Sequence, residues 1–191
     1  EEAVRLLRRA ADLGLEPVGV SFHVGSQQVD LSQWNAAIAR AARVFEALDR
    51  SGIRLSLLNL GGGFPARYQR DVPALTEYGR VIREAVQAEF GDDWPDLIIE
   101  PGRGLVGDAG VIQAEVVLIS TKGSADARRW VYLDIGKFSG LAETMDEAIK
   151  YRLRTPHDGG ACGPVVVAGP TCDSADVLYD KADYQLPLAL G

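Results

Sequence analysis

Apolar side chains in the first hundred residues switch repeatedly between helical and strand spacing. They recur every three or four positions in three segments, which predicts helices over 2–13, from Asp30 to Gly52 and from Asp71 to Gly91. Short alternating or fully apolar runs predict strands at 17–24, 53–60 and 97–99. Helices that alternate with short strands are typical of parallel βα units.

The pattern changes after about residue 105. Apolar runs predict strands at Val111–Ser120, Trp130–Ile135 and Val165–Ala168, and helical spacing returns at Ala142–Leu153. We therefore expect a parallel α/β part followed by a mainly β part.

Composition narrows the class of protein. The 191 residues carry 20 Lys and Arg against 27 Asp and Glu, a net charge of -7, and 47% are hydrophobic. An acidic chain is poorly suited to neutralise a phosphate backbone, so we expect no nucleic-acid partner. No apolar run reaches the length of a membrane span, and the N-terminus reads as a helix rather than a signal peptide. Two cysteines, Cys162 and Cys172, suit a reducing compartment, and we expect a cytoplasmic protein.

Three predicted strands end in clusters of unusual residues. These are Phe22-His23-Val24-Gly25-Ser26, Asn59-Leu60-Gly61-Gly62-Gly63-Phe64-Pro65 and Ile99-Glu100-Pro101-Gly102-Arg103-Gly104. Because ligands bind at the carboxyl ends of parallel strands, neighbouring strands would bring all three clusters to one rim.

The glycine cluster can act as a tight turn or as a set of bare amides that approach an anion. Arg103 can supply the matching positive charge or form a surface ion pair. The segment Gly102–Gly107 also fits the dinucleotide pattern G-x-G-x-x-G, which leaves a nicotinamide oxidoreductase as an alternative. Pro101 and the absence of a following long helix count against that alternative.

Two side chains at the strand ends can carry chemistry. Glu100 terminates an apolar strand, so we expect its carboxylate to be partly desolvated and to need a cationic or proton-sharing partner. His23 can be a structural histidine or part of a site. With two histidines and no His/Cys cluster, we expect no metal site.

A loop in the second half, Gly169–Asp176, places Cys172 beside Asp173. It can be an Asp-capped turn with a bystander cysteine. It can also present a thiol proton donor beside an anionic pocket for an ammonium group.

Together these motifs resemble the pyridoxal phosphate (PLP) decarboxylases of basic amino acids that share the alanine-racemase barrel. Four motifs carry the resemblance, in the order of the family. They are His23–Ser26, Gly61–Pro65, Glu100–Arg103 and Cys172–Asp176. The resemblance implies an α/β fold in which a partial (β/α)8 TIM-like barrel precedes a mainly β domain. Residues 1–107 would be the later part of the PLP-binding barrel and 108–191 an incomplete β domain.

The resemblance also implies how the barrel residues hold PLP. His23 would stack on the pyridine ring, and Glu100 would pair with the ring nitrogen so that the ring accepts electrons. The phosphate would lie among Ser26, Arg103 and the backbone amides of the three glycines Gly61, Gly62 and Gly63.

Further roles implied by the resemblance fall on the second half. Cys172 would return a proton to the substrate after carbon dioxide leaves, with His23 as the other catalytic residue. Asp173 would bind the distal ammonium, and Glu143 would make a second contact to it. In this family the Cys172 and Asp173 loop reaches across a homodimer interface into the partner's site.

Within the family, ornithine decarboxylase fits best and implies conversion of L-ornithine to putrescine in polyamine biosynthesis. Diaminopimelate decarboxylases typically carry Glu where this chain has Asp173. Diaminopimelate, lysine or arginine decarboxylase remain alternatives. So does a non-catalytic PLP-binding protein of the same barrel, although such proteins lack the cysteine loop.

Two elements of the family have no counterpart in this sequence, the Schiff-base lysine and a phosphate-binding tyrosine that lies near the C-terminus of the family's members. The Schiff-base lysine lies upstream of the first motif, and no residue before His23 is a lysine. A barrel of this type has eight βα units, whereas the pattern predicts three. We expect the chain to be an internal piece of a longer enzyme and to be inactive alone.

Overall fold

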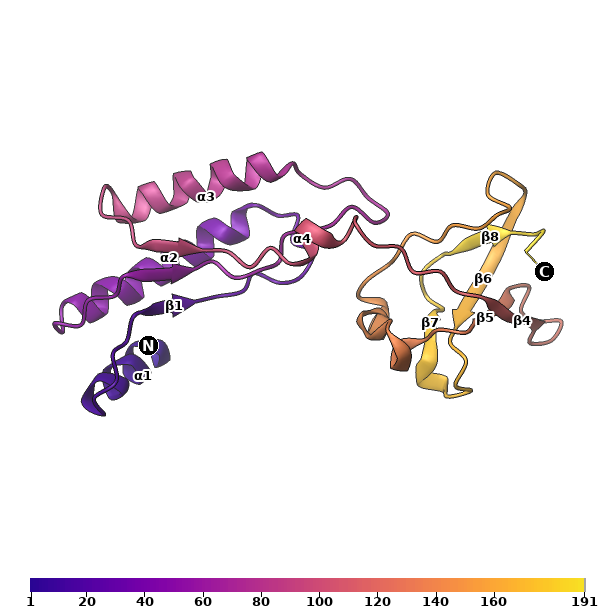
Figure 1. Cartoon of the computed structure of the whole chain (residues 1–191), viewed down its shortest axis with the longest axis horizontal. Helices are drawn as coiled ribbons and strands as arrows, with labels where there is room; N and C mark the ends of the chain where they lie inside the picture. The colour runs from indigo at the N-terminus through magenta and orange to yellow at the C-terminus, as the bar shows by residue number, and fades with distance from the viewer. Residues whose placement is uncertain (191) are drawn as a thin grey trace. The chain divides into compact units, whose positions relative to one another are not determined.

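The computed structural model describes residues 1–190 and divides into two compact units, Glu1–Gly110 and Val111–Gly191 (Figure 1). Unit 1 alternates helices with strands, and the regular secondary structure of unit 2 consists of strands and 3-10 turns. Unit 1 contains α1 (Glu2–Asp12), β1 (Gly19–Ser21), α2 (Ser32–Asp49), β2 (Leu57–Asn59), α3 (Leu75–Phe90), β3 (Asp96–Ile98) and α4 (Arg103–Val106). Unit 2 contains strands β4 (Val116–Thr121), β5 (Arg129–Leu133), β6 (Cys162–Ala168), β7 (Val177–Tyr179) and β8 (Gln185–Pro187), with 3-10 turns η1 (Lys137–Ser139), η2 (Ala142–Glu147) and η3 (Ser174–Asp176).

The predicted parallel βα units are confirmed in unit 1. Strand β2 pairs in parallel with β1 on one side and with β3 on the other. Strands β1 and β2 are shorter than predicted, because regular pairing is limited to three residues in each, whereas β3 has the predicted three residues and begins one residue earlier. No closed barrel forms within residues 1–190, since β1 and β3 are the two edges of this sheet.

The core of unit 1 lies between the sheet and helices α2 and α3. The Trp34 ring packs 5.1 Å from Phe64 and 5.2 Å from Tyr78, centroid to centroid. All three rings are buried, and Leu58 of the central strand and Leu60 just after it belong to the same cluster. Phe64 directly follows the triple glycine, so this core anchors the glycine-rich segment.

The start of α2 is held by the side chain of Asp30. The Asp30 carboxylate lies before the helix and accepts hydrogen bonds from the Ser32 N–H (3.0 Å) and the Gln33 amide (2.8 Å). Gln33 therefore reaches the Asp30 carboxylate rather than a backbone N–H. Hydrogen bonds from Gln33 and Ser32 lower the pKa of Asp30.

Unit 2 is built around β6. This strand runs parallel to β5 and antiparallel to β7 and β8, while β4 and β5 pair antiparallel. Val131 of β5 packs with Val165, Val167, Leu178 and Tyr179 in a second core.

The helix predicted over Ala142–Leu153 is wrong. The structure has the short turn η2, which is broken by non-helical angles at Met145 and Asp146. Asp146 and Glu147 both have positive φ, at 53° and 57°. The Glu147 carboxylate accepts three backbone N–H groups from residues 180–182, at 2.6–2.7 Å. These contacts to a distant segment outweigh the helical spacing.

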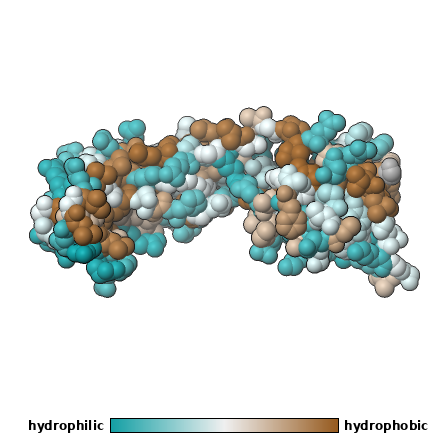
Figure 2. All heavy atoms as spheres, turned by 60° about the horizontal axis from the view of Figure 1, so that its bottom comes forward, coloured by the Kyte–Doolittle hydropathy of each residue, from teal (hydrophilic) through white to brown (hydrophobic). Residues whose placement is uncertain are grey.

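Apolar side chains remain exposed on both units, where Figure 2 shows brown patches among polar residues. In unit 1 they include Leu97 and Ile98 of the edge strand β3, which are 37% and 43% exposed.

Candidate active site

The three motif-bearing strand ends of unit 1 lie side by side. Backbone pairing continues beyond the strands from the Phe22 N–H to the Asn59 carbonyl (3.1 Å) and from the Leu60 N–H to the Ile98 carbonyl (2.8 Å). The Glu100 N–H then donates to the Gly61 carbonyl at 2.8 Å. The expectation that the three clusters share one rim is confirmed.

Each of the three glycines after β2 occupies a position that excludes a side chain. A Cβ on Gly61 would lie 2.0 Å from the Phe22 carbonyl oxygen, and one on Gly63 would lie 2.4 Å from that of Gly25. A Cβ on Gly62 would lie 2.8 Å from the Glu100 carbonyl oxygen and 3.4 Å from His23 Nε2. Gly62 therefore lies between two of the predicted site residues.

The amides of these glycines are not equivalent. The Gly61 N–H donates to Asn59 Oδ1 at 2.9 Å, so it is already engaged within the protein. Within residues 1–190, the N–H groups of Gly62 and Gly63 donate to no acceptor, although Gly62 is buried. Buried N–H groups without a partner are rare. Two adjacent bare amides fit an anion such as a phosphate.

The Glu100 side chain is oriented by Asn59, the last residue of β2. Asn59 Nδ2 donates to Glu100 Oε1 at 2.7 Å while Asn59 Oδ1 accepts from Gly61. Glu100 is exposed, so the expectation of a partly desolvated carboxylate is wrong for residues 1–190. The reason is that Glu100 follows the edge strand β3, whose residues are all exposed. No role for Asn59 was predicted, and its position at a strand end was the available signal.

His23 is fixed by its own loop. The Gly25 N–H donates to His23 Nδ1 at 2.9 Å, so the neutral imidazole carries its proton on Nε2, the atom nearest Gly62. His23 and Ser26 are both exposed.

The loop after β1 is joined to the glycine-rich segment by two glutamines. The Gln27 side chain donates to the Ala66 carbonyl (3.0 Å) and accepts from the Ala66 N–H (2.7 Å). The Gln28 N–H donates to the Gly63 carbonyl at 2.9 Å. These bonds hold the His23 loop and the bare amides in one arrangement.

Arg103 begins the short helix α4 on the same rim. Its guanidinium lies 3.5 Å from the Tyr68 hydroxyl and 6.0 Å from the centre of the Tyr68 ring. The dinucleotide pattern has a packing explanation instead. A Cβ on Gly104 would lie 2.9 Å from Phe64 Cβ, and one on Gly107 would lie 2.6 Å from Ala66 Cβ. These glycines let α4 approach the glycine-rich segment.

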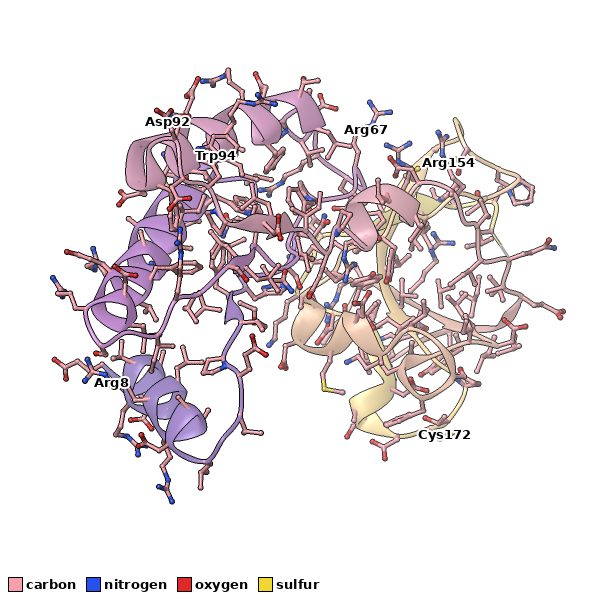
Figure 3. The ribbon with its side chains drawn as sticks, turned by 60° about the vertical axis from the view of Figure 1, so that its left-hand side comes forward. Arg8, Arg67, Asp92, Trp94, Arg154 and Cys172 are labelled. Carbon is pink, nitrogen blue, oxygen red and sulfur yellow. The ribbon has the colours of Figure 1, made fainter. Side chains whose placement is uncertain are left out.

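Cys172 and Asp173 lie on a surface loop of unit 2, where Figure 3 labels Cys172. Cys172 is exposed and has a positive φ of 60°. The Asp173 carboxylate accepts from the Ala175 N–H at 2.8 Å and caps η3. The Asp-capped turn and the thiol presentation thus occur in the same loop.

The buried carboxylate of Asp176 holds this loop through hydrogen bonds, a role that the sequence did not reveal. Asp176 is 1% exposed, and its carboxylate accepts from the Lys137 N–H and the Thr171 hydroxyl, both at 2.7 Å. A Cβ on Gly136 or Gly169 would lie 2.3 Å from its carboxylate oxygens. Both glycines are therefore required beside the buried acid.

Glu143 lies in η2 of unit 2 and is exposed. Its Oε2 accepts from the Tyr151 hydroxyl at 3.1 Å. The backbone of Tyr151 is held in turn, because its N–H donates to the Tyr179 hydroxyl (3.0 Å) and its carbonyl accepts from the Tyr184 hydroxyl (2.7 Å).

The described residues 1–190 contain neither a metal-binding cluster nor a membrane-spanning helix. No three His, Cys, Asp or Glu side chains there are placed to hold a metal ion. None of the helices in that range has the length and apolarity to cross a membrane.

Comparison with known proteins identifies the family. Residues 1–107 match the family model described as "Pyridoxal-dependent decarboxylase, pyridoxal binding domain". The chain belongs to this family. Its first 107 residues are thus a pyridoxal phosphate-binding domain, and the expected cofactor is confirmed.

Individual members of this decarboxylase family match across nearly the whole chain. The lysine/ornithine decarboxylase of Selenomonas ruminantium is 33% identical over 98% of this chain and 46% of its own length. A structure of lysine/ornithine decarboxylase from Vibrio vulnificus, complexed with cadaverine, aligns with a TM-score of 0.78 and 32% identity over 97% of this chain and 48% of that chain. Diaminopimelate decarboxylase from Helicobacter pylori, complexed with L-lysine, aligns with a TM-score of 0.74 and 31% identity over 97% of this chain and 44% of that one. The chain therefore spans about half the length of the relatives it matches.

Proposed function

We propose that the protein containing this chain uses PLP to decarboxylate a basic amino acid, with L-ornithine as its preferred substrate and putrescine as its product. The observation that carries the proposal is the single rim on which His23, Glu100 and the bare amides of Gly62 and Gly63 lie together. Membership of the pyridoxal-dependent decarboxylases supports it.

Unit 1 supplies the groups that would hold PLP. The Gly62 and Gly63 amides, Ser26 and Arg103 would bind the phosphate, with Gly61 contributing its conformation rather than its amide. His23 would stack on the ring, and Glu100 would face the ring nitrogen. When bound, PLP supplies an electron sink for the bond to the departing carboxylate.

Unit 2 supplies the groups that would act on the substrate. The exposed Cys172 thiol would donate a proton to the carbon that has lost carbon dioxide. Asp173 would bind the distal ammonium of the substrate, and Glu143 would make a second contact. We also propose that these residues complete the site of a partner subunit in a homodimer, and that unit 1 is part of a (β/α)8 barrel. Two exposed thiols suit the cytoplasm.

Ornithine is favoured over diaminopimelate by Asp173, because diaminopimelate decarboxylases typically carry Glu at this position. Lysine is the nearest competitor, since one extra methylene is worth only about 1–3 kcal/mol of discrimination. Relatives named for both substrates are found among the similar proteins.

The test is substrate turnover by the protein expressed from its complete gene. PLP binding is first measured by cofactor absorbance. Ornithine, lysine, diaminopimelate and arginine are then supplied separately, and the amine products are identified by mass spectrometry. The highest kcat/KM is expected for ornithine. A preference for another of the four would overturn the substrate assignment, and bound PLP without carbon dioxide release from any would favour a non-catalytic PLP-binding protein.

A further inference from the structure

Asn59 joins two parts of the proposed cofactor site through one side chain. Its Nδ2 donates to Glu100 Oε1 at 2.7 Å, and its Oδ1 accepts from the Gly61 N–H at 2.9 Å. The amide can donate on one side and accept on the other, whereas an ionised carboxylate has no donor and an ammonium has no acceptor. The residue is half-buried at the end of the central strand β2.

We propose that Asn59 is a positioning residue that sets the orientation of Glu100 toward the cofactor ring and at the same time fixes the glycine turn that binds the phosphate. This inference rests on the proposed function. Glu100 follows an edge strand and is exposed, so burial does little to restrict its side-chain rotamers. Within residues 1–190, the Asn59 amide is the only hydrogen-bond donor to the Glu100 carboxylate.

The two oxygens of the Glu100 carboxylate therefore have different environments. Oε1 is held by Asn59, and within residues 1–190 Oε2 has no hydrogen-bond partner. A carboxylate fixed through one oxygen can present the other at a defined place. Without Asn59, the Glu100 side chain would lose its conformational freedom only when the cofactor binds, and this entropy cost would lower the affinity for the cofactor.

The consequence for the glycine turn is selective. Because Asn59 engages the Gly61 N–H, the chain turns so that the next two amides, those of Gly62 and Gly63, remain without an acceptor within residues 1–190. One side chain thus couples the position of the ring-facing acid to that of the phosphate-facing amides.

The test uses the protein expressed from its complete gene, with and without PLP. Asn59→Asp keeps an acceptor for the Gly61 N–H but replaces the donor to Glu100 with a second carboxylate. Asn35→Asp is the matched control. Asn35 is exposed on α2, so this substitution makes the same chemical change away from the site. PLP affinity, the pH dependence of the bound cofactor's absorbance, and the melting temperature of the apoprotein are measured for each.

Asn59→Asp is expected to weaken PLP binding by about tenfold or more and to shift the pH profile of cofactor absorbance, while Asn35→Asp changes neither. Unchanged PLP affinity and pH profile in Asn59→Asp would overturn the role of Asn59 while leaving the proposed function intact. A loss of affinity matched by loss of apoprotein stability, with no change in the pH profile, would show a merely structural role and also overturn it.

Two further results are informative. If the unaltered protein does not bind PLP, the proposed function itself fails. If Asn59→Asp does not fold, Asn59→Ser retains an acceptor without adding charge, and the same affinity and pH-profile measurements then decide the role of Asn59.

Discussion

The buried carboxylate of Asp176 accepts two hydrogen bonds from Thr171, one from its hydroxyl (2.7 Å) and one from the Thr171 backbone N–H (3.3 Å). The two residues bracket the turn that presents Cys172 and Asp173. Because the same carboxylate also accepts the Lys137 N–H, it ties the loop to the segment that begins η1. The exposed Cys172 thiol thus lies on a loop that is held at its ends by the hydrogen bonds of a buried carboxylate.

Replacing this buried acid is expected to destabilise unit 2. Asp176→Ala leaves the Lys137 and Thr171 donors without their acceptor, which costs about 2–4 kcal/mol of unfolding free energy. Asp183→Ala, at an exposed position in the same unit, is the control and should change it by less than about 0.5 kcal/mol. Denaturant unfolding of both variants checks the prediction, and equal effects would contradict the anchoring role of Asp176.

A methyl group on Gly62 is expected to disrupt the cofactor site. Its Cβ would lie 2.8 Å from the Glu100 carbonyl oxygen, so either the glycine segment or the strand end must move. Gly62→Ala should therefore weaken PLP binding by about tenfold or more, as measured by fluorescence titration.

Gly79→Ala is the matched control for Gly62→Ala. Gly79 lies on the exposed side of α3, and a Cβ there meets no atom within 4 Å. This variant should keep full PLP affinity and gain about 0.5–1 kcal/mol of stability, because alanine favours a helix over glycine. If Gly62→Ala binds PLP as tightly as Gly79→Ala, the glycine segment is not the phosphate site.

Periodicity was sufficient to predict the parallel βα arrangement, because both faces of the short strands and one face of each helix are defined by apolar spacing. It was not sufficient for the polar contacts that complete the site. Asn59 and Asp176 act through hydrogen bonds to residues 41 and 39 positions away in the sequence, Glu100 and Lys137. Glu147 likewise ends a predicted helix through contacts 33–35 positions away. Apolar periodicity within one segment cannot predict hydrogen bonds between residues that are this far apart in the sequence.

Asp173→Ala is expected to separate substrate binding from cofactor binding. In the proposed function Asp173 contacts the distal ammonium, whereas PLP is held by unit 1. The KM for ornithine should rise by about tenfold or more while PLP affinity stays within about twofold. Steady-state kinetics and PLP titration of the same preparation check this. Equal losses of substrate and cofactor affinity would remove Asp173 from substrate recognition.

Glu147 makes the stability of unit 2 depend on pH. Burial acts to raise the pKa of Glu147, but the backbone N–H groups of Asp180, Lys181 and Ala182, together with Lys150, lower it below the usual value of 4.5. A group with a lowered pKa in the folded state contributes its full stabilisation above its unfolded value and loses it as pH falls through the folded value. We therefore expect this contribution at neutral pH and its progressive loss below about pH 4.5.

Glu147→Gln tests that dependence. The neutral amide cannot make charge-assisted hydrogen bonds to three N–H groups, so the variant should be about 1–2 kcal/mol less stable at pH 7, a figure kept small because the side chain is only half-buried. The difference from the unaltered protein should shrink as pH falls below 4.5, where the glutamate becomes protonated. Glu89→Gln removes an exposed charge on α3 and is the control. Urea unfolding between pH 3 and pH 7 measures all three proteins, and a difference for Glu147→Gln that stays constant across this range would show that the charge of Glu147 does not support the fold.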